Sequence, residues 1–377
     1  MPNNHYKLVC IATQANVPWF WTGLPGVGKT SILYALAREL KVPIHIEIGA
    51  ISEPSDIGGF PSINPETRYV ERLPLRWAEL LKDTNGIIVF DELPHSPPAS
   101  QAGMLRVIFE ARVGETELGP NVRRGAIGNP TDVAGGWDLN PALANRFCHI
   151  AWDMAGYHDS WLQGMTFGWQ SQLEIPILPA NWETRMPHWK ALVSVFAGKI
   201  RAPLLLAIPA SEHDRTGPWP SPRTWEMGAR LLAASESFGE DVQLELLSGC
   251  VGPGAAGEFL SWLKAADLPD PETLLATPES FPKIKPGQEH IIYAILSGVL
   301  SAIANHPDDA ARGTRWIQAT KVLYQAALIA PDVAFGFVTP ILLRQRPSFQ
   351  VQAPKEVRDL FLQYGTDLGI LTQPVTP

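Results

Sequence analysis

Residues 23–30 read GLPGVGKT, and this stretch decides the fold. It follows an apolar, aromatic run at 17–21 and precedes SILYALAREL, in which apolar residues recur with helical spacing. The sequence therefore predicts a strand, a glycine-rich turn and a helix, in that order. A GxxxxGK[ST] pattern in this setting is typical of a phosphate-binding loop, because successive backbone N–H groups converge on phosphate oxygens and glycine has no Cβ to block their approach.

Individual side chains of this loop have predictable tasks. Lys29 supplies a positive charge to the β and γ phosphates, Thr30 offers its hydroxyl to Mg²⁺, and the helix that begins near them adds its positive N-terminal end. A chance glycine-rich turn is the alternative, but the motif lies between a strand and a helix as its function requires. We therefore expect ATP and Mg²⁺ as cofactors, held by Gly23, Pro25, Gly26, Val27, Gly28, Lys29, Thr30, Ser31 and Asp91.

Two acids follow the run GIIVF at 86–90, which is suited to a buried parallel strand. Asp91 and Glu92 are then predicted at the carboxyl end of that strand, where α/β sheets bind ligands. We expect Asp91 to hold Mg²⁺ together with Thr30, and Glu92 to orient and deprotonate the attacking water. The alternative is that both acids are merely solvated in a strand-to-helix turn. The phosphate-loop motif upstream favours the functional interpretation over this one.

The pattern around these motifs predicts an α/β fold. Residues 43–48 (PIHIEI) alternate as a strand, and strands that alternate with helical segments imply a mostly parallel sheet flanked by helices. Turn residues within 56–74 predict a hairpin inserted near a helix, and 113–124 has the same character.

Beyond residue 152 the pattern changes to helices separated by prolines. Helical segments are expected at 186–206, 224–237 and 255–266, with a last helical region at 289–371. We predict three domains, an α/β nucleotide-binding core at 1–152, a helical lid at 153–266 and a helical C-terminal extension at 267–377.

Composition narrows the class of protein. Among 377 residues the formal net charge is −8, so the chain lacks the positive surface that nucleic-acid binding normally requires. The three cysteines are widely separated and have no metal-ligand spacing. Because no apolar run approaches the roughly 20 residues that span a bilayer, we expect a cytoplasmic protein without a membrane anchor.

An ordered series of segments resembles the AAA+ ATPases and, within them, the MoxR-like and dynein-related branch. After GLPGVGKT come EPSDIGGFP at 53–61, FDELPHSPPASQAGMLRVIFEARVG at 90–114 and AIGNPTDVAGGWDLNPALANRF at 126–147. The series covers about the first 150 residues, and a shorter match, SPRTWEMGARLL at 221–232, lies in the expected lid.

The resemblance implies roles for three further residues, which join Glu92 as catalytic candidates. Asn129 matches sensor 1, which holds the attacking water. Arg146 matches the arginine finger, which stabilises charge on the nucleotide of a neighbouring subunit, and Arg223 matches sensor 2 and is expected to point at the phosphates. The residues alone leave simpler alternatives open: an Asn before Pro forms turns, an arginine can cap a helix end, and Ser-Pro starts helices.

The resemblance also implies a function. The protein is then expected to form a ring of identical subunits, a hexamer, that hydrolyses ATP. Hydrolysis would remodel a partner protein, activate it or assist metal or cofactor insertion into it. The expected partner carries a von Willebrand factor A domain. The hairpin at 56–74 is placed towards the pore of such a ring, so Phe60, Tyr69 and Arg72 are candidates for substrate contact, with packing against the core as the default alternative.

The chain departs from the family in two places. Arg123 and Arg124 make the strand before Asn129 unusually polar, so one of them is expected to face a subunit boundary. The region after residue 240 is longer than a minimal lid and is expected to dock a partner. A nucleotide-dependent scaffold with little turnover is the second functional reading, and a nucleic-acid motor, disfavoured by the acidic balance, is the third.

Overall fold

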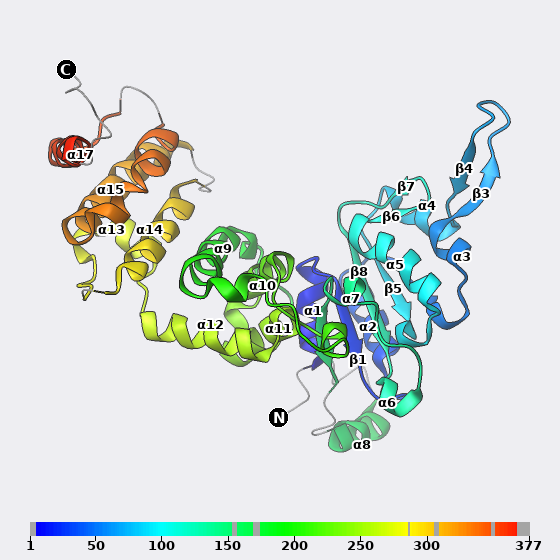
Figure 1. Ribbon diagram of the computed structural model, residues 1–377. Coiled ribbons are helices and arrows are strands. Elements are labelled where there is room, and N and C mark those ends of the chain that lie inside the picture. Colours follow the sequence, from blue (N-terminus) through cyan, green and yellow to red (C-terminus); the bar gives the residue numbers. More distant parts are fainter. Residues whose placement is uncertain are drawn as a thin grey trace. The chain divides into compact units, whose positions relative to one another are not determined.

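The structure is a computed structural model that describes residues 5–152, 157–168, 174–285, 287–304, 309–347 and 351–367 (Figure 1). The chain forms two compact units, one of Met1–Glu183 with Leu204–Gly257 and the other of Thr184–Pro203 with Glu258–Pro377. The predicted lid range, 153–266, contributes residues to both units, so the units do not coincide with the three predicted domains.

A five-stranded parallel sheet forms the centre of the first unit. Its order is β2-β5-β8-β1-β9, and all four strand pairs are parallel. The strands are β1 (Trp19–Thr22), β2 (Ile44–Ile48), β5 (Gly86–Asp91), β8 (Val122–Gly128) and β9 (Cys148–Ala151). The predicted α/β class and the strands expected before the phosphate loop, at 43–48 and at 86–90 are confirmed; β9 was not predicted.

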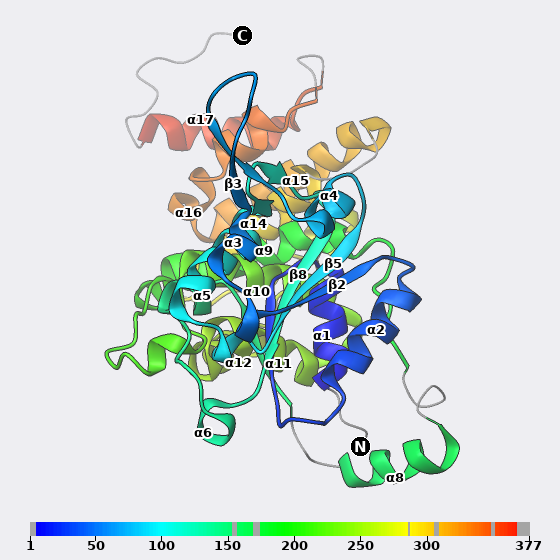
Figure 2. The same ribbon diagram turned by 90° about the vertical axis from the view of Figure 1, so that its right-hand side faces the viewer.

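Helices cover both faces of this sheet. Side chains alternate along a strand, so Trp19 and Trp21 point to one face and Phe20 to the other. Figure 2 shows α2 on one side of the strands and α5 on the other. The helices of this part of the unit are α1 (His5–Gln14), α2 (Lys29–Glu39), α3 (Pro54–Gly58), α4 (Arg76–Lys82), α5 (Pro98–Glu110), α6 (Thr131–Ala134), α7 (Pro141–Ala144) and α8 (Tyr157–Phe167).

Each face of the sheet is closely packed. On the face of α5, Phe20 and Phe90 of the strands lie in one buried cluster with Met104 of α5 and Phe147. On the opposite face the ring of Trp19 lies over β8, where a Cβ added to Gly125 would be 2.3 Å from the ring. The strand therefore needs glycine at this position, because a buried indole ring cannot move aside.

Two hairpins interrupt the α/β pattern where the sequence predicts insertions. β3 (Phe60–Ile63) pairs with β4 (Val70–Leu73), and β6 (Arg112–Val113) pairs with β7 (Thr116–Glu117), both antiparallel. Figure 1 shows the first hairpin extending beyond the other elements of its unit. Its aromatic side chains Phe60 and Tyr69 are 67% and 75% exposed.

Helices α10 (Pro222–Ala234) and α11 (Glu240–Val251) complete the first unit. They pack on each other, and α11 also packs against the edge strand β9. The contact is close, because a Cβ at Gly249 of α11 would lie 2.3 Å from the carbonyl oxygen of His149. The elements after residue 204 in this unit are therefore held directly against the sheet.

The second unit is helical and has its own core. Leu296 of α14, Trp316 and Leu323 of α15, and Val357 of α17 belong to one buried cluster. Its elements are α9 (Met186–Val195), a π-helical turn (Phe196–Ile200), α13 (Pro271–Ala276), α14 (Glu289–Ala304), α15 (Asp309–Ile329), α16 (Pro331–Phe335), a second π-helical segment (Val338–Arg344) and α17 (Lys355–Asp367), together with most of α12 (Pro253–Ala266).

The helical regions expected after residue 152 are confirmed in type, although the segment at 186–206 is divided into several short helices. The last four residues of the region predicted at 289–371 lie outside the described residues. Within the described ranges, no helix combines the length and the apolar character needed to cross a membrane.

Candidate functional site

The phosphate-loop motif forms the turn between β1 and α2, as predicted. Two of its glycines have positive φ angles, 79° at Gly26 and 98° at Gly28. A residue with a side chain is strained in this region of φ, whereas glycine adopts it freely. Gly28 is the residue that caps α2, so the first N–H groups of α2 point towards the loop.

Lys29 lies inside this loop and is only 8% exposed. Its Nζ donates hydrogen bonds to the carbonyl oxygens of Gly23 at 2.7 Å and Leu24 at 3.0 Å, and to Oδ1 of Asn129 at 3.2 Å. Burial lowers the pKa of Lys29, and the charge of Asp91 opposes that shift. The ammonium group is therefore held where the loop converges, beside the acid that ends β5.

Asp91 is the last residue of β5, and it lies close to Thr30 of the loop. Burial raises its pKa, while the backbone N–H of Glu92, the charge of Lys29 and a hydrogen bond with the Thr30 side chain act in the opposite direction. A hydroxyl and a partly desolvated carboxylate side by side offer oxygen ligands, which are the ligands that Mg²⁺ prefers. The residues predicted to hold Mg²⁺ therefore lie together and fit that ion.

Glu92 has an unusual backbone conformation. Its φ angle is 55° and its ψ angle 38°, the left-handed region that a residue with a side chain rarely adopts. The backbone N–H of Glu92 donates to Oδ1 of Asp91 at 2.7 Å, and within the described ranges its carboxylate has no hydrogen-bond partner. Such strain is often found at active sites, and here it lies at the residue that directly follows β5.

Asn129 follows β8, the strand between β5 and β1. Gly128, which precedes it, accepts a hydrogen bond from the N–H of Gly23 at 3.2 Å, so the start of the phosphate loop is tied to the end of β8. The parallel sheet thus brings Asn129, Lys29 and Asp91 together although they come from three segments of the sequence. This is the arrangement expected at the carboxyl edge of such a sheet.

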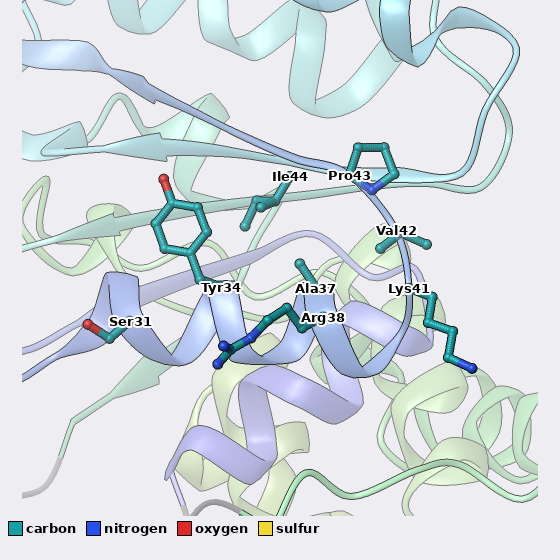
Figure 3. A pocket seen from close by; sticks show the side chains of 8 residues that line it. All are labelled: Ser31, Tyr34, Ala37, Arg38, Lys41, Val42, Pro43 and Ile44. Atoms are coloured by element: carbon teal, nitrogen blue, oxygen red, sulfur yellow. The ribbon is translucent and has the colours of Figure 1, made fainter. Parts of the chain in front are cut away.

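The remaining predicted loop residues are on the surface. Pro25 is exposed and Val27 is partly exposed, whereas Ser31 points outward from α2. Ser31 lines a hollow of about 560 Å³ along the outer side of α2, together with Tyr34, Ala37, Arg38, Lys41, Val42, Pro43 and Ile44 (Figure 3). Neither Lys29 nor Asp91 lines this hollow, so it is separate from the phosphate loop.

Arg146 lies just beyond α7. Its guanidinium group donates to the carbonyl oxygen of Ala142 and lies over the ring of Phe109 in α5, with the guanidinium carbon 4.7 Å from the ring centre. Burial and the neighbouring charge of Arg223 lower the pKa of Arg146, and Glu110 opposes them.

Arg223 lies over the same phenyl ring. Its guanidinium carbon is also 4.7 Å from the centre of Phe109, so one half-exposed ring carries two arginines. Phe109 belongs to α5, which covers the face of the sheet opposite to α2 (Figure 2). Arg223, which was expected to point at the phosphates, lies beside Arg146, and its contact with a nucleotide stays a prediction.

Phe109 is the residue that sequence reasoning missed. The available signal was a large aromatic side chain near the end of an amphipathic helix, next to the acid Glu110.

Arg123 and Arg124, singled out for their polarity, lie partly buried in β8, and burial lowers the pKa of both.

A parallel sheet with a GxxxxGK[ST] turn after its β1 strand, and an acidic pair ending the β5 strand, defines the class of P-loop nucleotide-binding folds. No protein-family model matches the chain, and no curated protein matches it.

Two solved structures are distantly similar. One, a predicted ATPase from Cytophaga hutchinsonii, has 16% identity and a TM-score of 0.38, with 74% of this chain and 88% of that chain covered. The other, a full-length MCM homologue from Methanopyrus kandleri, has 16% identity and a TM-score of 0.38, with 70% of this chain and 56% of that chain covered.

Proposed function

We propose that the protein is an ATPase of the AAA+ type whose complete active site is formed by two copies of the chain. The observation that carries this proposal is the separation of two half-sites. Lys29, Asp91 and Asn129 are gathered at one edge of the sheet, whereas Arg146 and Arg223 are paired over Phe109 of α5, and in the described residues no hydrogen bond joins the two groups. Two cations over one ring suit an anion that a second molecule brings.

Each half-site has a task in phosphoryl transfer. The loop N–H groups and Lys29 bind the triphosphate, Thr30 and Asp91 hold Mg²⁺, and the ion when bound neutralises charge on the β and γ phosphates. Glu92 accepts a proton from the attacking water, and Asn129 orients that water. Arg146 and Arg223 of the neighbouring copy stabilise the charge of the transition state.

The proposed assembly is a ring. When a surface carrying arginines meets a different surface carrying nucleotide, the contact is head-to-tail, and repeating it forms a ring where the rotation between copies closes. A hexamer of the MoxR type fits such a contact. Phe60, Tyr69 and Arg72 on the projecting β3–β4 hairpin then contact the protein that the ring remodels, activates or supplies with a metal or cofactor, a protein with a von Willebrand factor A domain.

Two substitutions test the phosphate-loop half. Lys29→Ala removes the ammonium group that binds phosphate, so nucleotide binding, measured with a fluorescent ATP analogue, is expected to be lost. Glu92→Gln removes the proton acceptor while keeping the shape of the side chain, so ATP binding is expected to persist and steady-state phosphate release to fall at least ~10²-fold. Turnover by Glu92→Gln at the wild-type rate would show that another group activates the water.

The two-copy site is tested by turnover as a function of protein concentration. The rate per subunit is expected to rise as the chains assemble, and Arg146→Ala to lower it by about 10³-fold, the smaller value for arginines supplied in trans. A rate per subunit that is constant from the isolated monomer to the assembled state would contradict the proposal. Assembly without turnover would instead favour the nucleotide-dependent scaffold.

A further inference from the structure

Asn145, the residue before Arg146, connects the segments that carry the two arginines. Its side chain is buried, with 5% of the residue exposed. Its Nδ2 donates to the carbonyl oxygen of Trp219 at 3.1 Å, and its Oδ1 accepts from the hydroxyl of Ser221 at 2.8 Å. One amide therefore spans from the end of α7 to the start of α10.

The start of α10 is itself closed by hydrogen bonds. Ser221 caps the helix, and its Oγ accepts from the backbone N–H of Thr224 at 3.2 Å. The hydroxyl of Thr224 accepts in return from the N–H of Ser221 at 2.8 Å. Arg223 lies between these two residues, so a displacement of the cap displaces its backbone as well.

We propose that Asn145 is a positioning residue, which holds Arg223 at a fixed place beside Arg146 so that both arginines reach the nucleotide of a neighbouring copy together. This inference rests on the proposed two-copy site. Asn145 itself does not touch the nucleotide and acts only through the two arginines.

The physical need for such a bridge is the repulsion between the arginines. Two cations over one phenyl ring disfavour each other, and the charge of Arg223 is the second cause, after burial, that lowers the pKa of Arg146. A buried amide whose nitrogen and oxygen are both hydrogen-bonded opposes their separation, because breaking these bonds leaves polar groups unsatisfied. Misplacement of a catalytic group by about 1 Å can cost ~10²-fold in rate, so a small shift of α10 matters.

The first test compares the two asparagines that flank the short helix α7. Asn145→Ala is expected to lower kcat by about 10- to 100-fold with the KM for ATP within about twofold, because the phosphate loop of the same chain is intact. Asn140→Ala is the matched control. Its Oδ1 caps the other end of α7 by accepting from the N–H of Ala142 at 2.8 Å, and in the described ranges it makes no hydrogen bond with α10.

Asn140→Ala is expected to lower the melting temperature and to leave kcat within about twofold, since a lost helix cap costs stability alone. Equal losses of kcat in the two variants, in proportion to their losses of stability, would overturn the proposal, because they would mean that Asn145 only supports the fold.

The second test asks in which copy Asn145 acts. Asn145→Ala chains have an intact phosphate loop, and Glu92→Gln chains have intact arginines but cannot hydrolyse ATP. Mixing the two variants is expected to give a higher turnover than either variant alone. The reason is that the arginines of a Glu92→Gln chain complete the phosphate-loop site of an Asn145→Ala chain. Arg146→Ala mixed with Glu92→Gln is the positive control.

The control separates the two proposals. If the Arg146→Ala mixture recovers turnover and the Asn145→Ala mixture does not, Asn145 acts in its own site and the inference is wrong. If neither mixture recovers turnover, the two-copy site is wrong and the inference falls with it.

Ser221→Ala serves where Asn145→Ala folds poorly, because it leaves Asn145 in place and removes one bond of the bridge together with the Oγ cap of α10. It is expected to lower kcat in the same direction, with recovery in the mixture. Combining it with Asn145→Ala is expected to add little further loss, since both changes break the same connection. A fully multiplicative loss would contradict the shared role.

Discussion

His149 shows how one side chain links the sheet to the helix that precedes Arg146. Its Nε2 lies 2.9 Å from the carbonyl oxygen of Ala144, the last residue of α7, and its ring lies edge-on to that of Phe20. Burial lowers the pKa of His149 to about 4, against an ordinary value of 6.5. The folded protein therefore keeps this imidazole neutral at pH values where the unfolded chain protonates it.

The shift predicts a loss of stability in acid. Between pH 6.5 and about 4 the unfolded state binds a proton that the folded state does not, so the free energy of unfolding falls as the pH falls, by on the order of 3 kcal/mol. Urea unfolding across this range measures the effect. His149→Gln, which keeps a donor without titrating, is expected to lack this component, and parallel curves for the two proteins would contradict it.

At the scale of the residue, the sequence predicts those site residues that belong to short local motifs. Lys29, Thr30, Asp91 and Glu92 belong to motifs in which spacing along the chain determines spacing in the sheet. The pairing of Arg146 with Arg223 was not predictable, because it depends on how α10 packs. The hydrogen bonds of Asn145 span 74 and 76 positions of sequence and leave no local pattern.

At the scale of the element, the β3–β4 hairpin is the clearest exception to burial. Phe60 and Leu73 are directly opposite in its ladder, and Ile63 is opposite Val70. All four side chains are more than half exposed. The default interpretation, in which the aromatic residues of this segment pack on the core, is therefore wrong for Phe60 and Tyr69.

This exposure predicts that the hairpin contributes little to folding stability. Tyr69→Ala is expected to change the free energy of unfolding by less than about 0.5 kcal/mol, because the ring is already in water. Phe90→Ala, a buried position of β5, is expected to cost about 3–5 kcal/mol. Urea unfolding of both variants measures the contrast, and a loss above about 2 kcal/mol for Tyr69→Ala would show that the ring packs somewhere in solution.

Some helices and strands are easier to predict from the sequence than others. β5 is a continuous apolar run, and the motif that follows β1 marks where that strand ends. β9 escaped prediction because its four residues, CHIA, include a histidine and follow the ANRF turn without a break in composition. It is recognised only through pairing, since its register with β1 is determined by the sheet.

At the scale of the whole molecule, two units with separate cores predict two unfolding transitions. The phosphate loop lies in the first unit alone. Saturating ATP with Mg²⁺ is expected to stabilise that unit, by about 2.7 kcal/mol at a ligand concentration of 100 Kd, and to leave the second unit unchanged. Calorimetry of Glu92→Gln, which does not consume the ligand, measures this as an upward shift of one transition.

Two variants assign the transitions. Lys29→Ala is expected to abolish the shift caused by ATP. Arg315 of α15 forms a bidentate ion pair with Glu272 of α13, in which both N–O distances are 2.7 Å. Arg315→Ala removes this pair and is therefore expected to lower only the transition temperature of the second unit. A single transition that moves as a whole with ATP would contradict the independence of the units.

The division at this scale was the least predictable from sequence. The helical composition after residue 152 was evident, but the second unit takes Thr184–Pro203 from before the α10–α11 pair and the rest from after it. Such an interleaved arrangement depends on which helices bury each other, and helical periodicity does not report that.

The phosphate loop and the arginine pair are separate groups of residues in one chain, and this separation has a genetic consequence. Under the proposed two-copy site, each chain takes part in two active sites, as nucleotide holder in one and as arginine donor in the other. A chain altered in both Lys29 and Arg146 but still able to assemble damages both sites. In a cell that makes normal and altered chains together, activity then falls as the square of the normal fraction, so such an allele is dominant.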